Sequence, residues 1–336
     1  MESRWSRRDF LKSTAAFVIF GAAQGALGSG QSQPPSLPVR PLGKTGELVS
    51  IIGFGAGSRF CSIQDENEAQ ALLERALELG INYFDTSASY TRRGGERLSE
   101  KRLGQFSRHR RKQVFLATKF DPRDRDGALR SVEKSLNFLQ AGYLDLVQIH
   151  ALRDHDDLIQ MGGPHGAVAA VRELKDQKVV RFIGITGHND GSAMAEALRR
   201  YEFDVVLMSL NAAQAANPVA ARRMEPIPAF EESALPVALQ KRMGIASMKV
   251  MGQGLLVGDG AGRARSSELL RFNLSQPVAS VVIGMEQKAR LEENVYVART
   301  FVPMSGNEKE KLREEVTPSR TTWYRFLRSH DDSLPV

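Results

Sequence analysis

The sequence predicts a (β/α)8 TIM barrel, a fold in which eight parallel strands each lead into a helix. From Arg40 onward, short apolar runs alternate with segments of helical periodicity, and eight such pairs follow one another. Strands that are apolar almost throughout are typical of parallel sheets covered on both faces, and eight strand–helix units are the number that closes into a barrel.

The predicted strands share short runs of β-branched and other apolar residues between polar or glycine-containing segments. They span Ile51–Gly55, Ile81–Asp85, Val114–Lys119, Leu144–His150, Val180–Thr186, Val205–Leu210, Ile245–Lys249 and Ala279–Ile283.

The predicted helices share apolar positions three or four residues apart, which fall on one face of a helix. They span Glu66–Leu79, Glu96–Leu103, Gly127–Leu139, Ala167–Lys175, Ala193–Tyr201, Phe230–Arg242, Ser266–Phe272 and Lys288–Thr300.

An open, doubly wound sheet is the competing fold for such an alternation. That fold usually carries Gly-x-Gly-x-x-Gly after its first strand, and the run Gly53-Phe54-Gly55-Ala56-Gly57 lacks this spacing. The barrel is therefore the fold that the sequence favours.

Composition excludes several classes of protein. With 336 residues, 42% hydrophobic and 25% charged, the chain is close to the globular average, which excludes a disordered, collagen-like or coiled-coil protein. The single cysteine, Cys61, excludes an intrachain disulfide and any metal site built from several thiolates, and we expect no metal. The net charge of +7 is scattered along the chain, which favours small anions such as phosphates over nucleic acid as ligands.

The N-terminus has the composition of an export signal. A charged head, Ser6-Arg7-Arg8-Asp9-Phe10-Leu11-Lys12, precedes an apolar stretch at residues 15–23 and then small residues up to Gly30. The paired arginines resemble a twin-arginine signal, which directs folded bacterial proteins to the export machinery. The alternative, an ordinary buried or amphipathic helix, fits less well because the uncharged stretch has no amphipathic pattern. We therefore expect a periplasmic protein whose mature chain has no stable membrane insertion.

These patterns divide the chain into four predicted segments. Residues 1–28 form the signal peptide, with cleavage near Gly28, and residues 29–39 form a flexible linker with several prolines. Residues 40–304 form the barrel, and residues 305–336 form a C-terminal extension.

Three ionisable residues close predicted strands: Asp85, Lys119 and His150. The carboxyl ends of barrel strands form one active face, so these side chains are expected to meet there. Each could have a purely structural role by itself: Asp85 as a turn cap, Lys119 as a solvated strand end and His150 as a buried core histidine. Their occurrence together favours a functional site.

The residues around these positions resemble the aldo-keto reductase family. The resemblance rests on Phe84-Asp85-Thr86-Ser87-Ala88-Ser89-Tyr90, on Ala117-Thr118-Lys119-Phe120 and on Asp145-Leu146-Val147-Gln148-Ile149-His150. Two further segments support it: Leu42-Gly43-Lys44-Thr45-Gly46 is similar to a hairpin that closes the barrel bottom, and Ser99–Gly104 is similar to the second helix. The resemblance covers about Arg40 to Thr300.

This resemblance implies a catalytic tetrad of Asp85, Tyr90, Lys119 and His150, and the reduction of an aldehyde, ketone or sugar-like carbonyl by hydride transfer. Negative charge builds on the carbonyl oxygen, so a positioned proton donor lowers the barrier. Tyr90 would be this general acid, because a nearby ammonium such as that of Lys119 favours the ionised form of a phenol. Asp85 would hold Lys119, and His150 would orient the carbonyl.

The resemblance also implies a nicotinamide dinucleotide. The run from Ile283 and Gly284 to Asn294 is similar to the family's dinucleotide segment, in which Arg290 would contact the adenosine 2′-phosphate and Glu293 and Asn294 the adenine. A helix N-terminus there would also favour a phosphate. NADP is therefore favoured over NAD.

The chain departs from the family pattern around the nicotinamide. Thr186 followed by Gly187 stands where many members have Ser-Asn, whereas Asn211 keeps a family asparagine. Met248 replaces an aromatic residue that stacks on the nicotinamide, and Lys249 would reach a phosphate.

Two less specific features concern the surroundings of the site. The glycine-rich run Gly252–Gly262 would either fold over a bound dinucleotide or serve as a flexible connection. The candidates for substrate-pocket walls are Phe54, Arg59, Phe60, His188 and Trp323.

Two other functions stay open at this point. A dinucleotide-binding barrel with little turnover would act as a regulatory or interaction subunit. An isomerase or lyase would use Lys119 and His150 without nicotinamide, although the dinucleotide segment counts against it.

Overall fold

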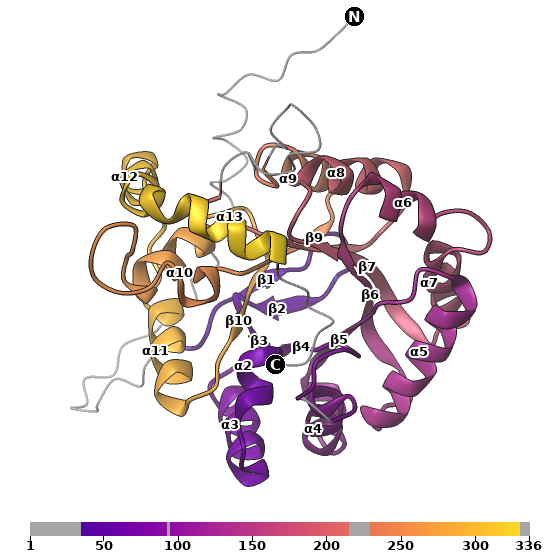
Figure 1. The fold of residues 1–336 in the computed structure, drawn as a ribbon. Coiled ribbons are helices and arrows are strands. Elements are labelled where there is room, and N and C mark those ends of the chain that lie inside the picture. Colours follow the sequence, from indigo (N-terminus) through magenta and orange to yellow (C-terminus); the bar gives the residue numbers. More distant parts are fainter. Residues whose placement is uncertain (1–34, 93–94, 215–228, 330–336) are drawn as a thin grey trace, which may run out of the picture. The chain divides into compact units, whose positions relative to one another are not determined.

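The computed structural model describes residues 35–92, 95–214 and 229–329, and the predicted signal peptide lies outside them. Eight parallel strands form a closed barrel in the order β10-β3-β4-β5-β6-β7-β8-β9, with the helices around it (Figure 1). The predicted (β/α)8 fold is confirmed. The strands are β3 (Ile52–Gly55), β4 (Tyr83–Asp85), β5 (Phe115–Phe120), β6 (Leu144–Leu152), β7 (Val180–Gly187), β8 (Val205–Ser209), β9 (Gly244–Met248) and β10 (Ser280–Gly284).

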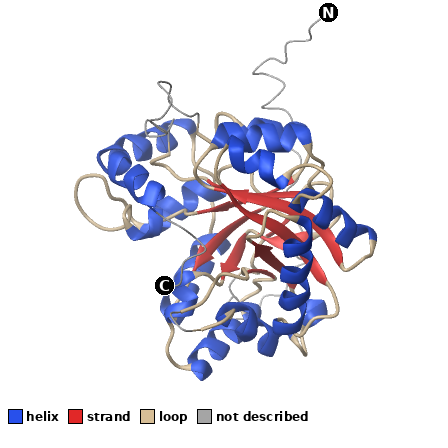
Figure 2. Ribbon diagram, turned by 45° about the vertical axis from the view of Figure 1, so that its right-hand side comes forward, coloured by secondary structure: helices blue, strands red, loops and turns tan. Residues whose placement is uncertain are grey.

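Helices cover the outside of the strands, which lie in the middle of the molecule (Figure 2). The helices are α2 (Ser58–Ser62), α3 (Glu66–Glu78), α4 (Leu98–Ser107), α5 (Arg125–Phe138), α6 (His155–Met161), α7 (Ala167–Asp176), α8 (Gly191–Arg200), α9 (Ala234–Gln240), α10 (Ser266–Leu274), α11 (Lys288–Arg299), α12 (Gly306–Val316) and α13 (Arg320–Ser329), with short 3-10 turns η1 (Arg111–Gln113), η2 (Gly252–Gly254) and η3 (Thr317–Ser319).

Aspartate caps set where several helices begin. The Asp124 carboxylate accepts a hydrogen bond from the backbone N–H of Gly127 at 2.7 Å, and that of Asp190 accepts one from Ala193 at 2.8 Å. An N-cap of this kind satisfies an otherwise unpaired amide of the first turn. Helices α5 and α8 therefore start directly after their caps, two residues before the predicted starts.

A β-hairpin closes the bottom of the barrel, as the sequence predicted. Strands β1 (Val39–Pro41) and β2 (Leu48–Ser50) pair antiparallel. Leu42, between them, is fully buried in the cluster that fills the barrel interior. Gly43 has a φ of 56°, and a Cβ there would lie 2.2 Å from the backbone nitrogen of Gly244. Only glycine permits this close approach of the hairpin to β9.

The packed chain begins slightly earlier than expected. Leu37 is buried in the main core and Val39 opens β1, so this end of the predicted linker is part of the fold. In the C-terminal extension, Trp323 and Tyr324 of α13 are buried in one cluster with Phe272 of α10. Among the described residues, no helix has the length and apolar character needed to cross a bilayer.

Candidate active site

The four predicted catalytic residues meet at the carboxyl ends of adjacent strands. Asp85 is the last residue of β4, Lys119 lies in β5, and His150 lies in β6. Lys119 pairs in register with Gln148, and side chains two residues apart on a strand share a face, so His150 lies on the same face as Gln148. Tyr90 follows β4 in a loop and reaches back over these strand ends.

Lys119 connects the acidic and phenolic members of the tetrad. Its side chain is only 1% exposed, and its ammonium forms an ion pair with Asp85. Nζ also donates to the carbonyl oxygen of Thr86 at 2.8 Å and to the hydroxyl of Tyr90 at 3.4 Å. A buried positive charge beside a phenol stabilises the phenolate form.

Asp85 is buried together with its partner. Burial raises the pKa of Asp85 above its ordinary value, while the charge and hydrogen bond of Lys119 oppose this shift. The side-chain amide of Gln148 donates to the second carboxylate oxygen at 3.2 Å. Both oxygens of Asp85 therefore have a partner that holds the carboxylate in place.

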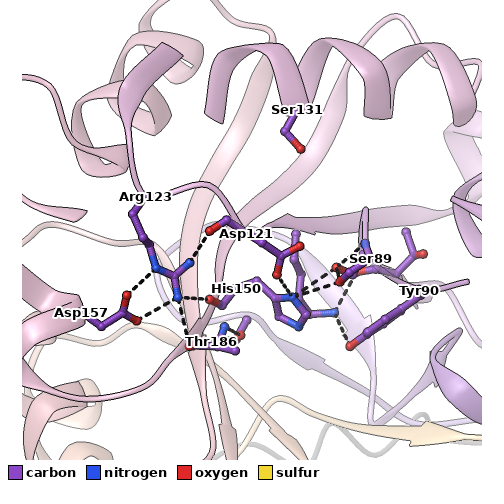
Figure 3. Close-up of polar contacts among 12 residues, drawn as sticks. Ser89, Tyr90, Asp121, Arg123, Ser131, His150, Asp157 and Thr186 are labelled. Carbon is purple, nitrogen blue, oxygen red and sulfur yellow. Dashed lines mark hydrogen bonds and ion pairs between the residues drawn. The ribbon is translucent and has the colours of Figure 1, made fainter. Parts of the chain in front are cut away.

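His150 lies between Tyr90 and an aspartate that the sequence reasoning did not single out (Figure 3). The rings of Tyr90 and His150 meet edge to face, with centroids 5.7 Å apart. On its other side, His150 Nδ1 lies 2.8 Å from Oδ1 of Asp121. Partial burial raises the pKa of Asp121, but the hydrogen bond and charge of His150 and the charge of Arg123 outweigh burial, so the pKa is lowered.

Arg123 fixes the backbone on both sides of this pair (Figure 3). Its guanidinium forms a two-pronged ion pair with Asp157, at 2.7 and 2.9 Å. It also donates to the carbonyl oxygens of Asp121 at 2.9 Å, His150 at 2.8 Å and Ala151 at 3.1 Å. Ala151 has a left-handed φ of 49°, and these bonds hold the chain in that unfavourable conformation.

A cleft runs from two tetrad residues across the ends of β3, β9 and β10 to helix α11. Its described lining includes Asp85 and Tyr90 at one end. Six of the eight predicted cofactor residues also line it: Met248, Lys249, Gly284, Arg290, Glu293 and Asn294. Asp85 and Tyr90 thus share one cleft with the predicted dinucleotide segment, whereas Lys119 and His150 are buried beside it.

Charged side chains of both signs border this cleft. Arg59 lies 3.4 Å from Glu286, and Arg290 lies 3.0 Å from Glu293. Glu286 precedes α11, where an acidic group disfavours an anion, and the Arg59 pair offsets its charge. The N-cap residue Gln287 makes no side-chain cap with the first turn of α11. Cationic side chains and a helix N-terminus are groups that fit a phosphate.

Thr186 and Asn211 do not line the cleft. The Thr186 hydroxyl accepts a hydrogen bond from the backbone N–H of Ala151 at 2.8 Å. The Asn211 amide accepts from the N–H of Ala213 and donates to the carbonyl of Lys249, each at 3.1 Å. Both side chains are almost fully buried, and they hold the backbone of neighbouring strand ends rather than facing the opening.

Most of the candidates for substrate-pocket walls do not line this cleft. Of the five, only Arg59 lines the cleft, and the others are buried: Phe54, Phe60, His188 and Trp323. The glycine-rich run borders the cleft through Gln253, Gly254 and Val257, and Arg59 donates to the carbonyl of Gln253 at 3.4 Å. Within the described ranges, no group of three or more His, Cys, Asp or Glu side chains is placed to hold a metal.

A signal for some of the missed residues was present in the sequence. Gln148 precedes His150 by two positions, and Asp121 follows Lys119 by two, so strand alternation places each on the face of its catalytic neighbour. Arg123 had no such signal, because its contacts join loops that meet only in the folded chain.

Comparison with known proteins is consistent with this geometry. The sequence profile described as "Aldo/keto reductase family" matches residues 51–268. L-galactose dehydrogenase of Arabidopsis thaliana is 28% identical over 318 residues, covering 83% of this chain and 93% of that protein. D-threo-aldose 1-dehydrogenase of a Pseudomonas species is 26% identical over 245 residues, covering 63% of this chain and 68% of that protein.

A solved structure has the same architecture. The holo form of aldo-keto reductase AKR11C1 from Bacillus halodurans matches with a TM-score of 0.64 and 25% identity, covering 83% of this chain and 96% of that one. The profile match spans more than half of the chain and includes all four tetrad residues. The chain belongs to the aldo-keto reductase family and is an oxidoreductase.

Proposed function

We propose that the protein is an NADP-dependent oxidoreductase that interconverts a carbonyl and an alcohol, with Tyr90 as the proton-transferring residue. The observation that carries this proposal is the contact of the buried Lys119 ammonium with both Asp85 and the Tyr90 hydroxyl at the end of the cleft. The dinucleotide segment lines the same cleft, so a hydride donor bound there would be near these groups.

The four side chains have distinct roles in this reaction. Tyr90 gives a proton to the oxygen of the carbonyl in reduction and takes it back in oxidation. Lys119 stabilises the phenolate that remains, since its ammonium lies beside the hydroxyl in a water-poor site. Asp85 keeps Lys119 in place, and His150 orients the reacting oxygen.

The cofactor would be held by residues along the cleft. Arg290 would bind the 2′-phosphate, Glu293 and Asn294 the adenine, and Lys249 a bridging phosphate, with Met248 against the nicotinamide. Gly284 has no side chain to fill the cleft at the end of β10. When bound, the reduced nicotinamide supplies the hydride. In this proposal Thr186 and Asn211 support the site through the backbone contacts described above.

We infer a sugar or sugar-like polyol as the substrate class. Two relatives are named as a galactose and an aldose dehydrogenase, and each matches more than three-fifths of this chain. We also propose that the protein is exported by the twin-arginine route to the periplasm, which rests on Arg7 and Arg8 and the apolar stretch after them.

Fluorescence titration with NADPH, followed by NADPH consumption with a panel of aldoses and aldehydes, tests the proposed function. Tyr90→Phe should bind NADPH normally and lose about 10²–10⁴-fold in turnover, since it lacks the transferable proton. Tyr296→Phe, on the exposed face of α11, is the matched control. If the parent protein binds NADPH but consumes none with any compound of the panel, the result would favour a regulatory or interaction subunit. If the parent protein does not bind NADPH, the proposal is contradicted.

A further inference from the structure

Asp121 is a partly exposed carboxylate beside the buried tetrad. It follows β5 directly, two residues after Lys119, and its side chain is 37% exposed, whereas that of His150 is 1% exposed. Oδ1 of Asp121 lies 2.8 Å from His150 Nδ1. An acidic group at these strand ends thus reaches solvent while it contacts a tetrad residue (Figure 3).

The position of Asp121 in the barrel separates it from the predicted dinucleotide residues. In the closed strand order, β5 and β6 lie across the barrel from β9 and β10. Met248 and Gly284, at the ends of β9 and β10, line the cleft together with residues of α11. A dinucleotide bound along these residues would reach the tetrad from the β9 and β10 side. The ends of β5 and β6 are then left for the rest of the substrate.

The charge of Asp121 suits a hydroxyl group as its ligand. Burial raises the pKa of this carboxyl group, but the hydrogen bond and charge of His150 and the charge of Arg123 outweigh burial, so the pKa is lowered. The carboxylate is therefore ionised at neutral pH and only accepts hydrogen bonds. A hydroxyl group of a substrate can donate to it, whereas a carbonyl, ether or hydrocarbon group cannot.

Neighbouring side chains hold this acceptor in place. Arg123 donates to the backbone carbonyl of Asp121 at 2.9 Å and to that of His150 at 2.8 Å. Its charge is offset by Asp157, which accepts two hydrogen bonds from the guanidinium at 2.7 and 2.9 Å. The hydroxyl of Ser89, 3.5 Å from His150 Nδ1, adds a second polar group at the same edge. An acceptor that is already held in place loses little freedom when it binds a donor.

We propose that Asp121 determines substrate specificity: its carboxylate accepts a hydrogen bond from a hydroxyl group on a carbon next to the reacting carbonyl. This inference rests on the proposed function and narrows its substrate class to hydroxylated carbonyl compounds, such as the open-chain forms of sugars. His150 orients the reacting oxygen, and Asp121 contacts the same ring, so the carbons beside the carbonyl come within reach of the carboxylate. A substrate without that hydroxyl would cover the carboxylate and leave it without a donor, which weakens binding.

Glyceraldehyde and propanal test this inference, because they have the same carbon skeleton and differ in their hydroxyl groups. We would measure kcat and KM for both aldehydes with NADPH in the parent protein, Asp121→Ala and Asp121→Asn. The ratio of kcat/KM for glyceraldehyde to that for propanal should fall by about 10–100-fold in Asp121→Ala, the value of a hydrogen bond to a charged group. It should fall less in Asp121→Asn, whose amide oxygen still accepts a hydrogen bond. Any effect on the reaction through His150 is common to both aldehydes and cancels in the ratio.

Two further measurements separate substrate selection from a structural role. The loss should appear mainly in KM for glyceraldehyde, since a bond to a non-reacting hydroxyl is made equally in the bound substrate and in the transition state. NADPH should bind to Asp121→Ala as tightly as to the parent protein in a fluorescence titration, because Asp121 lies away from the dinucleotide residues. Asp126→Asn removes an exposed carboxylate at the start of α5 and should leave the ratio unchanged.

An unchanged ratio in Asp121→Ala would overturn the inference, even if both rates fall together, because Asp121 would then affect the reaction and not the choice of substrate. Failure of the proposed function would appear differently. A parent protein that reduces neither aldehyde with NADPH would contradict the proposed function, and this inference with it.

Discussion

Replacing Asp85 by asparagine removes the carboxylate that neutralises the buried ammonium of Lys119. Loss of one partner of a buried ion pair typically costs about 3–5 kcal/mol, because the other charge remains without compensation. Lys119 keeps hydrogen bonds to the Thr86 carbonyl and the Tyr90 hydroxyl, so we expect the lower end of this range. For a domain of roughly 300 residues, the unfolding entropy is about 0.6 kcal/mol per kelvin, and 3 kcal/mol corresponds to a fall in Tm of about 5 °C.

The double variant Asp85→Asn with Lys119→Met separates stability from catalysis. It removes both charges, and replacing a buried ion pair by uncharged groups of similar volume is often neutral for stability. We therefore expect the double variant to recover most of the free energy of unfolding lost in the single variant. It should stay inactive, since Tyr90 then lacks its cationic neighbour.

Urea unfolding followed by far-UV circular dichroism measures these free energies, with calorimetry for Tm. The decisive quantity is the coupling between the two substitutions. Two results would refute the reasoning: a free energy of unfolding for Asp85→Asn within about 1 kcal/mol of that of the parent protein, or a double variant that is less stable than Asp85→Asn. In either case Asp85 would not be needed to neutralise the buried ammonium of Lys119.

Three further outcomes follow from the sequence and the structure. Arg290→Ala should weaken NADPH binding by about 10–100-fold, the value of a hydrogen bond to a charged group, and leave NADH binding unchanged in the same fluorescence titration; equal losses for both would exclude a 2′-phosphate contact. Burial raises the pKa of the Cys61 thiol to about 11, so at pH 8 it should react with a thiol reagent only after denaturation; rapid reaction in the native protein would contradict this. Replacing Arg7 and Arg8 by lysine should keep the protein in the cytoplasm in cell fractionation, whereas Arg4→Lys should not, and continued export of the double variant would refute the twin-arginine signal.

The sequence alone predicted all eight barrel strands, because each is an apolar run between polar segments. Helix starts were less accurate where a single side chain decides them. Helix α4 begins at Leu98 rather than Glu96, because Arg97 has a left-handed φ of 47° that no helix can include. Helix α12 was not predicted, since among its residues only Leu312 and Val316 are buried, too few for an apolar stripe.

Some residues of the candidate site were predictable from the sequence, and others were not. Asp85, Tyr90, Lys119 and His150 carry a motif that spans three strands, and their proximity follows from the barrel topology. Asp121 and Arg123 lie in the same loop but have no motif, and their contacts depend on the exact course of the chain after β5. The backbone roles of Thr186 and Asn211 were likewise invisible, because a hydroxyl or amide offers no sign in the sequence of which partner it takes.

The hairpin that closes the bottom of the barrel lies at the end opposite the cleft, so stability and substrate choice depend on different parts of the chain. The hairpin residues Leu42 and Gly43 are fitted against the start of β9 without slack, whereas the cleft is formed by loops at the opposite strand ends. Exchange of these loops for those of another member of the family would therefore leave the packing of the hairpin against the barrel unchanged. To change which substrate the protein accepts, the rim loops are therefore the part to replace, and the hairpin and the strand ends that it covers are the part to keep.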